Sequence, residues 1–124
     1  MSIKYTNKDK RGFTLIELLI VITIIQVLAS IAIPQFALFR QRAFNTVANS
    51  DLRNAALTQE AYYADHGIYR DGLDGLTTFP YNLYISKGVT MSLEGSSSGY
   101  SIIAYHNSGD KTYNLAVPGG NISH

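Results

Sequence analysis

Residues 10–34 read KRGFTLIELLIVITIIQVLASIAIP, and this stretch decides how the chain is organised. Sixteen of the 21 residues from Phe13 to Ile33 are hydrophobic. As a helix, this segment is about 31 Å long, which matches the ~30 Å hydrocarbon core of a bilayer. Residues 1–12 carry four basic side chains and one acidic one, so the basic flank lies on the N-terminal side. Basic flanks stay on the cytoplasmic side, which predicts a cytoplasmic N-terminus.

A cleavable secretory signal is the competing interpretation of the same stretch. Such a signal has an apolar region of about 7–15 residues followed by small residues, and Val27-Leu28-Ala29 fits a cleavage site of that kind. The apolar run in this chain is longer, and the helical pattern continues well past it. A membrane anchor is therefore the favoured interpretation.

Glu17 is the one charged residue of the apolar stretch. A carboxylate at the centre of a membrane helix costs about 2.5–3.5 kcal/mol. Glu17 either reaches the headgroups from the cytoplasmic end of the helix or needs a cation inside the membrane. The stretch contains no Lys or Arg, so the available cation is a new α-amine on Phe13, formed by a cut after Gly12. That amine would be neutralised by Glu17 of the same chain or of a neighbouring chain.

The order of a short basic leader, Gly12, Phe13, Glu17, an apolar run and Pro34 resembles the N-terminus of type IV prepilins and the related pseudopilins. The close match covers about residues 10–44, and the general plan covers the rest. The resemblance implies that a membrane-embedded prepilin peptidase cuts after Gly12 and N-methylates Phe13. It also implies that Glu17 pairs with the methylated amine of an adjacent subunit and sets the register of the filament.

The same resemblance implies a function, partners and a location. The chain would be a structural subunit of a type IV pilus, a homo-oligomeric helical filament used for adhesion, motility or DNA uptake. The prepilin peptidase, an assembly ATPase, a platform protein and a secretin would build it. The chain would span the inner membrane once before assembly and lie on the cell surface afterwards. The alternatives are a pseudopilin of a type II secretion system and, in another class, a monomeric membrane-anchored module that binds a ligand.

Two features depart from the family pattern. Many members carry a glycine in the middle of the apolar stretch, and in those pilins the segment between it and the proline loses helicity. This chain has Gln26 there, which lacks the backbone freedom of glycine, so melting of residues 26–34 stays open. Pro34 removes one N–H and crowds the preceding turn, which predicts a kink or local unwinding near Ser30–Pro34.

The second departure is that the chain has no cysteine, so the C-terminal cysteine pair of many pilins is absent. Thr23 and Gln26 are either hydrogen-bonding contacts between packed helices or tolerated polar residues.

Residues 34–66 are expected to continue the rod as an amphipathic helix. There is no Gly or Pro from Gln35 to Ala64, and seven alanines favour helix. Gly67 is placed to take the left-handed conformation that ends a helix. The expected apolar stripe comprises Phe44, Val47/Ala48, Leu52, Ala55/Ala56, Gln59 and Tyr62/Tyr63. The residues expected mostly off this stripe are Arg40, Arg42, Asn45, Asn49, Asp51 and Arg53.

Residues 67–124 are predicted to form a globular β-sheet head. Alternation of apolar and polar residues predicts four strands, Tyr81–Ile85, Val89–Leu93, Tyr100–Tyr105 and Thr112–Val117. Short connections predict an antiparallel meander, one face of which covers the apolar stripe of the helix. The expected fold class is therefore α+β, with a long N-terminal helix packed on a small antiparallel sheet of about four strands. The predicted organisation is a leader (1–12), a membrane and filament-core helix (13–33), an amphipathic helix (34–66) and the head (67–124).

The head offers little chemistry in its sequence. Asp71 and Asp74 are weak candidates for calcium, because their spacing is not that of an EF-hand and Asp-Gly pairs are common in turns. No metal or cofactor is otherwise expected. No catalytic pair of carboxylates, serine triad or phosphate-binding glycine loop is recognised, so an enzyme is not expected. Only Arg70, Lys87 and Lys111 are basic after the helix, so nucleic-acid binding by one subunit is expected to be weak at most.

Overall fold

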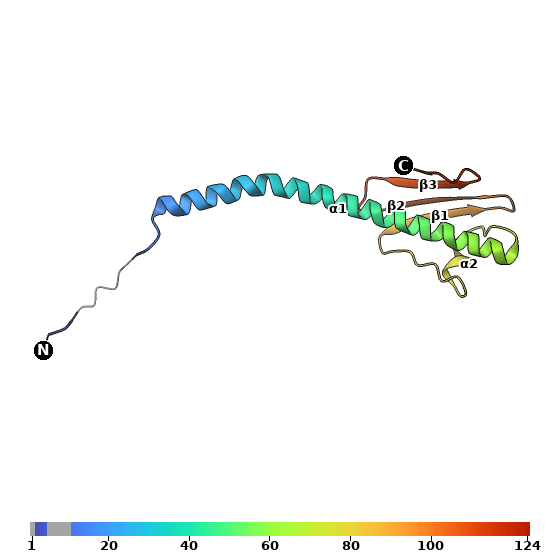
Figure 1. Ribbon diagram of the computed structural model, residues 1–124, viewed down its shortest axis with the longest axis horizontal. Coiled ribbons are helices and arrows are strands. Elements are labelled where there is room, and N and C mark those ends of the chain that lie inside the picture. Colours follow the sequence, from blue (N-terminus) through green and yellow to red (C-terminus); the bar gives the residue numbers. More distant parts are fainter. Residues whose placement is uncertain (1, 5–10) are drawn as a thin grey trace. The chain divides into compact units, whose positions relative to one another are not determined.

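The computed structural model describes residues 2–4 and 11–124, and part of the predicted leader, residues 1 and 5–10, lies outside them (Figure 1). The chain divides into two compact units, Met1–Ala37 and Leu38–His124. The elements in chain order are α1 (Leu15–His66), α2 (Asp74–Thr77), β1 (Val89–Gly95), β2 (Tyr100–His106), β3 (Thr112–Val117) and β4 (Ile122–Ser123). The helix α1 contributes to both units.

The first unit contains the apolar part of α1. Its large hydrophobic side chains are exposed, and α1 is long and apolar enough to cross a membrane. Pro34 lies inside the helix, and residues 30–34 are helical, so the predicted unwinding is not seen there. Pro34 cannot donate to the carbonyl of Ser30, but the other bonds of the helical ladder hold the turn. The kink at Pro34 stays a prediction.

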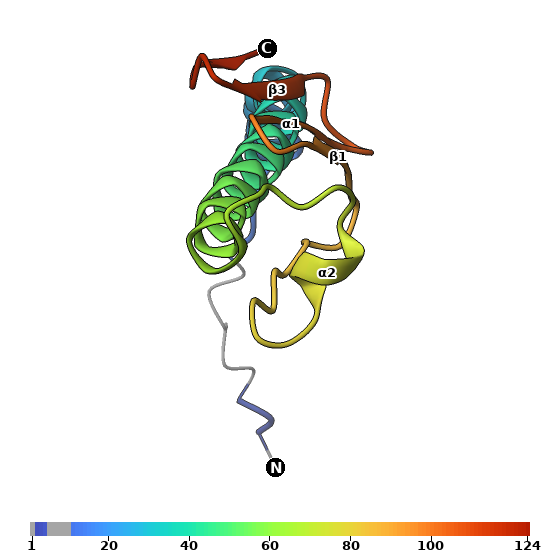
Figure 2. The same cartoon turned by 90° about the vertical axis from the view of Figure 1, so that its right-hand side faces the viewer.

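The second unit comprises the head and the part of α1 that packs on one face of its antiparallel sheet (Figure 2). The strand order is β1-β2-β3-β4, which confirms the predicted meander and the α+β class. Ile102 lies opposite Leu93 on one side and Leu115 on the other, and all three are buried. Ala48 and Leu52 of α1 are fully buried against this face. The helix and the sheet therefore share one hydrophobic core.

The strand predicted at Tyr81–Ile85 is wrong, because the backbone turns there. The amide of Asn82 donates to the carbonyl of Thr78 at 2.9 Å, and the φ of Asn82 is 48°, in the left-handed region that a strand does not use. The amide of Leu83 donates to the carbonyl of Leu76 in α2 at 2.7 Å. Leu83 is buried as its apolar position predicts, but the fourth strand of the sheet is β4.

The end of α1 matches its sequence signal. The helix ends at His66, and Gly67 follows with a φ of 72°. The amide of Gly67 donates to the carbonyl of Tyr63 at 2.7 Å, which satisfies one of the open carbonyls at the helix C-terminus. This left-handed residue lets the chain leave the helix and return along the head.

Candidate functional site

The predicted cleavage and register residues surround the start of α1. Gly12 and Phe13 precede the helix in non-helical backbone, and Phe13 is 91% exposed. The amide of Thr14 donates to Oε2 of Glu17 at 3.0 Å, and the amide of Glu17 donates to Oγ1 of Thr14 at 3.3 Å. This reciprocal pair is a capping box, and it defines Thr14 as the residue that caps the helix.

The capping box gives Glu17 a stabilising environment within its own chain. The first amides of a helix have no intrahelical acceptor, and the helix dipole favours negative charge at this end. Thr14 was not singled out from sequence, although Thr-x-x-Glu before an apolar run is the usual signature of a capping box. The bond between Gly12 and Phe13 lies just outside this cap. A cut there would place an α-amine one residue before Thr14, close in sequence to the Glu17 carboxylate.

Further along the apolar part of α1, the hydroxyls of Thr23 and Ser30 donate to carbonyls of their own helix. The Thr23 hydroxyl donates to the carbonyl of Leu19 at 2.7 Å, and the Ser30 hydroxyl donates to the carbonyl of Val27 at the same distance. Of the two interpretations of Thr23, these bonds favour a tolerated polar residue. Between Leu18 and Ile33 the exposed surface of the helix is therefore mostly hydrocarbon, with Gln26 as an exposed polar side chain.

Three buried polar side chains of α1 hold the head loops, and two of them correct the prediction from sequence. Asn45 is 5% exposed and Asp51 is 4% exposed, although both were expected off the buried stripe; Gln59 is fully buried as expected. These side chains are buried because each forms hydrogen bonds with a loop of the head. A hydrophobic pattern in the sequence does not predict such bonds. We call Asn45, Asp51 and Gln59 the polar clamps.

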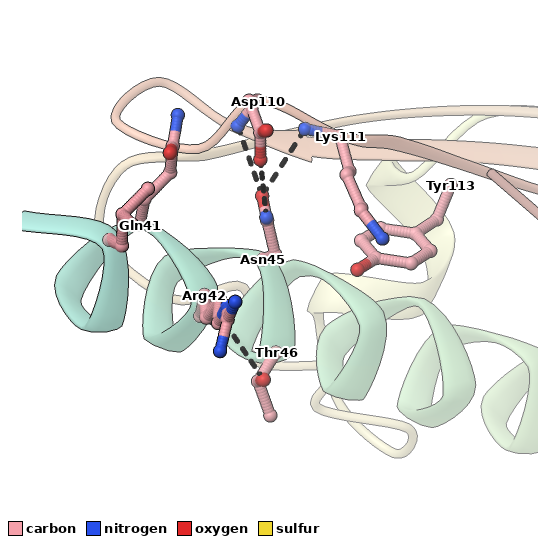
Figure 3. A pocket seen from close by; sticks show the side chains of 8 residues that line it. Gln41, Arg42, Asn45, Thr46, Asp110, Lys111 and Tyr113 are labelled. Carbon is pink, nitrogen blue, oxygen red and sulfur yellow. Dashed lines mark hydrogen bonds between the residues drawn. The ribbon is translucent and has the colours of Figure 1, made fainter. Parts of the chain in front are cut away.

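Asn45 clamps the loop between β2 and β3 (Figure 3). Its Nδ2 donates to Oδ1 of Asp110 at 2.6 Å, and its Oδ1 accepts from the amides of Asp110 at 3.1 Å and Lys111 at 3.2 Å. These groups line a polar pocket of about 460 Å³ together with Arg42 and Tyr113. The pocket combines both charge signs but no cluster of metal ligands among the described residues. The geometry here supports a structural role.

Asp51 and Gln59 clamp two further segments. Asp51 Oδ2 accepts from the amide of Ser86 at 2.7 Å, and its Oδ1 accepts from the Ser86 hydroxyl at 3.1 Å, just before β1. Gln59 Nε2 donates to the carbonyl of Arg70 at 2.7 Å, and its Oε1 accepts from the Arg70 amide at 3.0 Å. The three clamps therefore attach the helix to three loops in a chain that has no disulfide.

Of the two calcium candidates, Asp71 has another partner for its carboxylate. Asp71 Oδ1 accepts from the amide of Gly95 at 3.2 Å, and Asp74 begins the short helix α2. Among the described residues, no three His, Cys, Asp or Glu side chains gather where they could hold a metal ion. The geometry thus uses Asp71 to join a loop to β1.

Tyrosines at the far end of the head meet carboxylates. The Tyr81 hydroxyl donates to Oδ2 of Asp65 at 2.7 Å, and the Tyr100 hydroxyl donates to Oε1 of Glu60 at 3.4 Å. The pKa of Tyr81 is raised to about 12, mainly by desolvation and secondly by its hydrogen bond to the Asp65 carboxylate. The pKa of Tyr100 is also raised to about 12, mainly by desolvation and secondly by the negative charge of Glu60. Both phenols are therefore donors at neutral pH, and they attach the end of α1 to the head.

Comparison with known proteins places these features in a family. Residues 7–33 match the family described as the prokaryotic N-terminal methylation motif. The chain is 39% identical over 108 residues to the type IV wide pilus major component of Thermus thermophilus, covering 82% of this chain and 78% of that protein. It is 39% identical over 71 residues to the type IV major pilin of Myxococcus xanthus, covering 57% and 32% of the two chains. It is 33% identical over 77 residues to the type II secretion system core protein G of Pseudomonas aeruginosa, covering 60% and 54%. The long apolar helix, the small antiparallel sheet and an identity that extends over most of both chains lead to one conclusion: the protein belongs to the type IV pilin family.

Proposed function

We propose that the chain is a structural subunit of a type IV pilus and that it polymerises through the apolar part of α1. The observation that carries this proposal is the similarity to the Thermus thermophilus pilus component, which covers 82% of the chain. A match of that length includes the head as well as the rod, whereas the methylation motif alone is confined to residues 7–33. The head therefore resembles that of a major pilus component.

The physical basis of polymerisation is the unpartnered apolar surface of the first unit. Leu15, Phe36 and most hydrophobic side chains between them are well exposed, so in water this helix would be unstable in isolation. A bilayer covers that surface before assembly, and neighbouring copies of the same helix cover it afterwards. Transfer between the two environments exchanges one apolar contact for another, so register must come from the few polar groups.

Glu17 is the proposed register residue, together with the α-amine of Phe13 that cleavage after Gly12 would create and methylation would modify. The capping box supports this role because it fixes the carboxylate at the helix N-terminus before any amine is present. In a filament, the negative charge of the Glu17 carboxylate would attract the α-amine of an adjacent copy. The surroundings there have a low dielectric constant, so this attraction would be strong. Displacement along the rod would separate the two charges.

The partners follow from this proposal. A prepilin peptidase would remove residues 1–12, and an assembly ATPase, a platform protein and a secretin would extrude the filament. The membrane orientation, with the basic N-terminus in the cytoplasm, agrees with the charge of the leader. A pseudopilin of a type II secretion system is the second candidate, because the chain also matches the core protein G of such a system at 33% identity.

The test is immunogold electron microscopy of intact cells with an antibody to the head, combined with N-terminal sequencing of sheared material. We expect labelled surface fibres whose chains begin at methylated Phe13. A block in protein secretion when the gene is deleted, together with no labelled fibres on unaltered cells that export the chain, would favour the pseudopilin. Purified chains that begin at Met1 would contradict the processing step.

A further inference from the structure

Two apolar features of the head lie at opposite edges of its sheet. The strand order makes β1 and β4 the edges. The loop that follows α2, residues 78–86, lies on the β1 side in both ribbon views, whereas β3 and the C-terminus lie on the other side (Figures 1 and 2). A feature on one edge of the sheet can therefore meet a feature on the other edge only in a second copy.

The first feature is a pair of aromatic rings on the loop after α2. Phe79 is 86% exposed and Tyr84 is 74% exposed, and we call them the aromatic knob. Residues 75–86 carry no charged side chain, which is unusual for an exposed segment. The amide of Asn82 donates to the carbonyl of Thr78 across the base of the Phe79 turn, the amide of Leu83 donates to the carbonyl of Leu76 in α2, and the amide of Ser86 donates to the clamp Asp51. The rings are therefore presented on a fixed backbone.

The second feature is an apolar groove between α1 and the β4 edge, which we call the β4 groove. It has a volume of about 370 Å³. Its lining residues are Arg53, Ala56, Leu57 and Glu60 of α1 with Leu115, Gly120 and Ile122. Leu57, one of these lining residues, is 71% exposed. An apolar cavity of about 150 Å³ accommodates benzene, so the groove has room for an aromatic ring with space to spare.

We propose that the β4 groove of one head receives the aromatic knob of a second copy of the chain. This inference rests on the proposed function, because packing of the rods is what brings the heads side by side. The occupant is another copy rather than an unrelated partner because the chain itself carries an uncharged, exposed aromatic pair that suits the groove. Leu57 would cover one face of the inserted ring.

The placement of the two features determines what kind of assembly results. Knob and groove are different surfaces, so the contact is heterologous, and each bound copy still offers a free knob or a free groove. Such a contact propagates instead of stopping at a dimer, which is the property a filament requires. The contact does not have to hold two free heads together, because it recurs at every subunit that the rods already hold together.

The test uses cysteine cross-linking, since the natural chain has no cysteine. Fibres sheared from cells that carry Phe79→Cys together with Leu57→Cys are mildly oxidised and run on a denaturing gel. We expect a ladder of dimers, trimers and higher species, and monomers from either single variant. The matched control pairs Phe79→Cys with Asn114→Cys, an exposed residue of β3, and should give no ladder.

A second measurement does not depend on cross-linking. Phe79→Ser removes the more exposed ring of the knob and should raise the monomer concentration in equilibrium with fibres by about tenfold or more. Tyr105→Ser removes an aromatic ring that is 41% exposed in β2, and should leave that concentration unchanged. Intact fibres without a ladder, or an equal effect of both Ser variants, would overturn the inference. Absence of fibres from the unaltered chain would instead contradict the proposed function, so the two failures are distinguishable.

Discussion

Replacement of Gln59 by leucine tests whether the polar clamps stabilise the head. The side chain is fully buried, and its amide forms two hydrogen bonds with the backbone of Arg70, at 2.7 and 3.0 Å. Leucine fills a similar volume, so the main change is that the N–H and C=O of Arg70 lose their partners. A net hydrogen bond contributes about 0.5–1.5 kcal/mol, which predicts a loss of about 1–3 kcal/mol in the free energy of unfolding.

The assay is urea unfolding of the full chain in mild detergent, followed by near-ultraviolet circular dichroism. The chain has nine Tyr and no Trp, so this signal reports on the tyrosines, several of which pack in the head. The matched control is Gln35→Leu, because Gln35 is exposed in the first unit. A change for Gln59→Leu within about 0.5 kcal/mol, the range of ordinary surface substitutions, would refute the clamp as a source of stability.

Three further predictions concern the rod and the head. Glu17→Gln keeps an oxygen that can accept from the Thr14 amide but removes the negative charge. We therefore expect normal membrane insertion but few fibres by electron microscopy. A fibre yield equal to that of the unaltered chain would contradict the register role of Glu17. Gly12→Ala should leave an uncut precursor, and intact mass showing normal processing would contradict the cleavage position. The raised pKa of Tyr100 predicts that its contribution to stability is fully present below its ordinary value near 10 and is lost as the pH rises through about 12. Tyr100→Phe should therefore make urea stability fall less steeply with pH over this range, and an unchanged slope would contradict the assignment.

Much of the fold is predictable because hydrophobic periodicity reports which side faces the core. The alternation at Tyr100, Ile102 and Ala104 corresponds to buried positions of β2, and Gly67 marks the end of the helix. The same signal fails at residues 81–85, where alternate apolar residues are present but Asn82 adopts a left-handed backbone. The predicted burial of Leu83 is therefore confirmed although the predicted strand is wrong, because a loop packed on a core can show the same alternation of buried residues.

The site is predictable only in part, for a different reason. Gly12, Phe13 and Glu17 are recognised because their spacing is a motif, whereas Asn45 and Asp51 look like solvent-exposed polar residues of an amphipathic helix. Their burial depends on loop backbones far away in sequence, 65 residues for Asn45 and Asp110 and 35 for Asp51 and Ser86. Local pattern contains no information about such partners. Thr14 is the opposite case, since its capping partner is three residues away and the pattern was present in the sequence.

The polar clamps have a consequence for how the head matures. Each loop is attached by bonds that form and break reversibly, so folding of the head needs no thiol oxidation and no disulfide isomerase. The same fold should result in a reducing or an oxidising compartment, and reductants should leave it intact. Strength against mechanical load must then come from many weak attachments acting together, which yield and re-form, rather than from a covalent link that either holds or is lost.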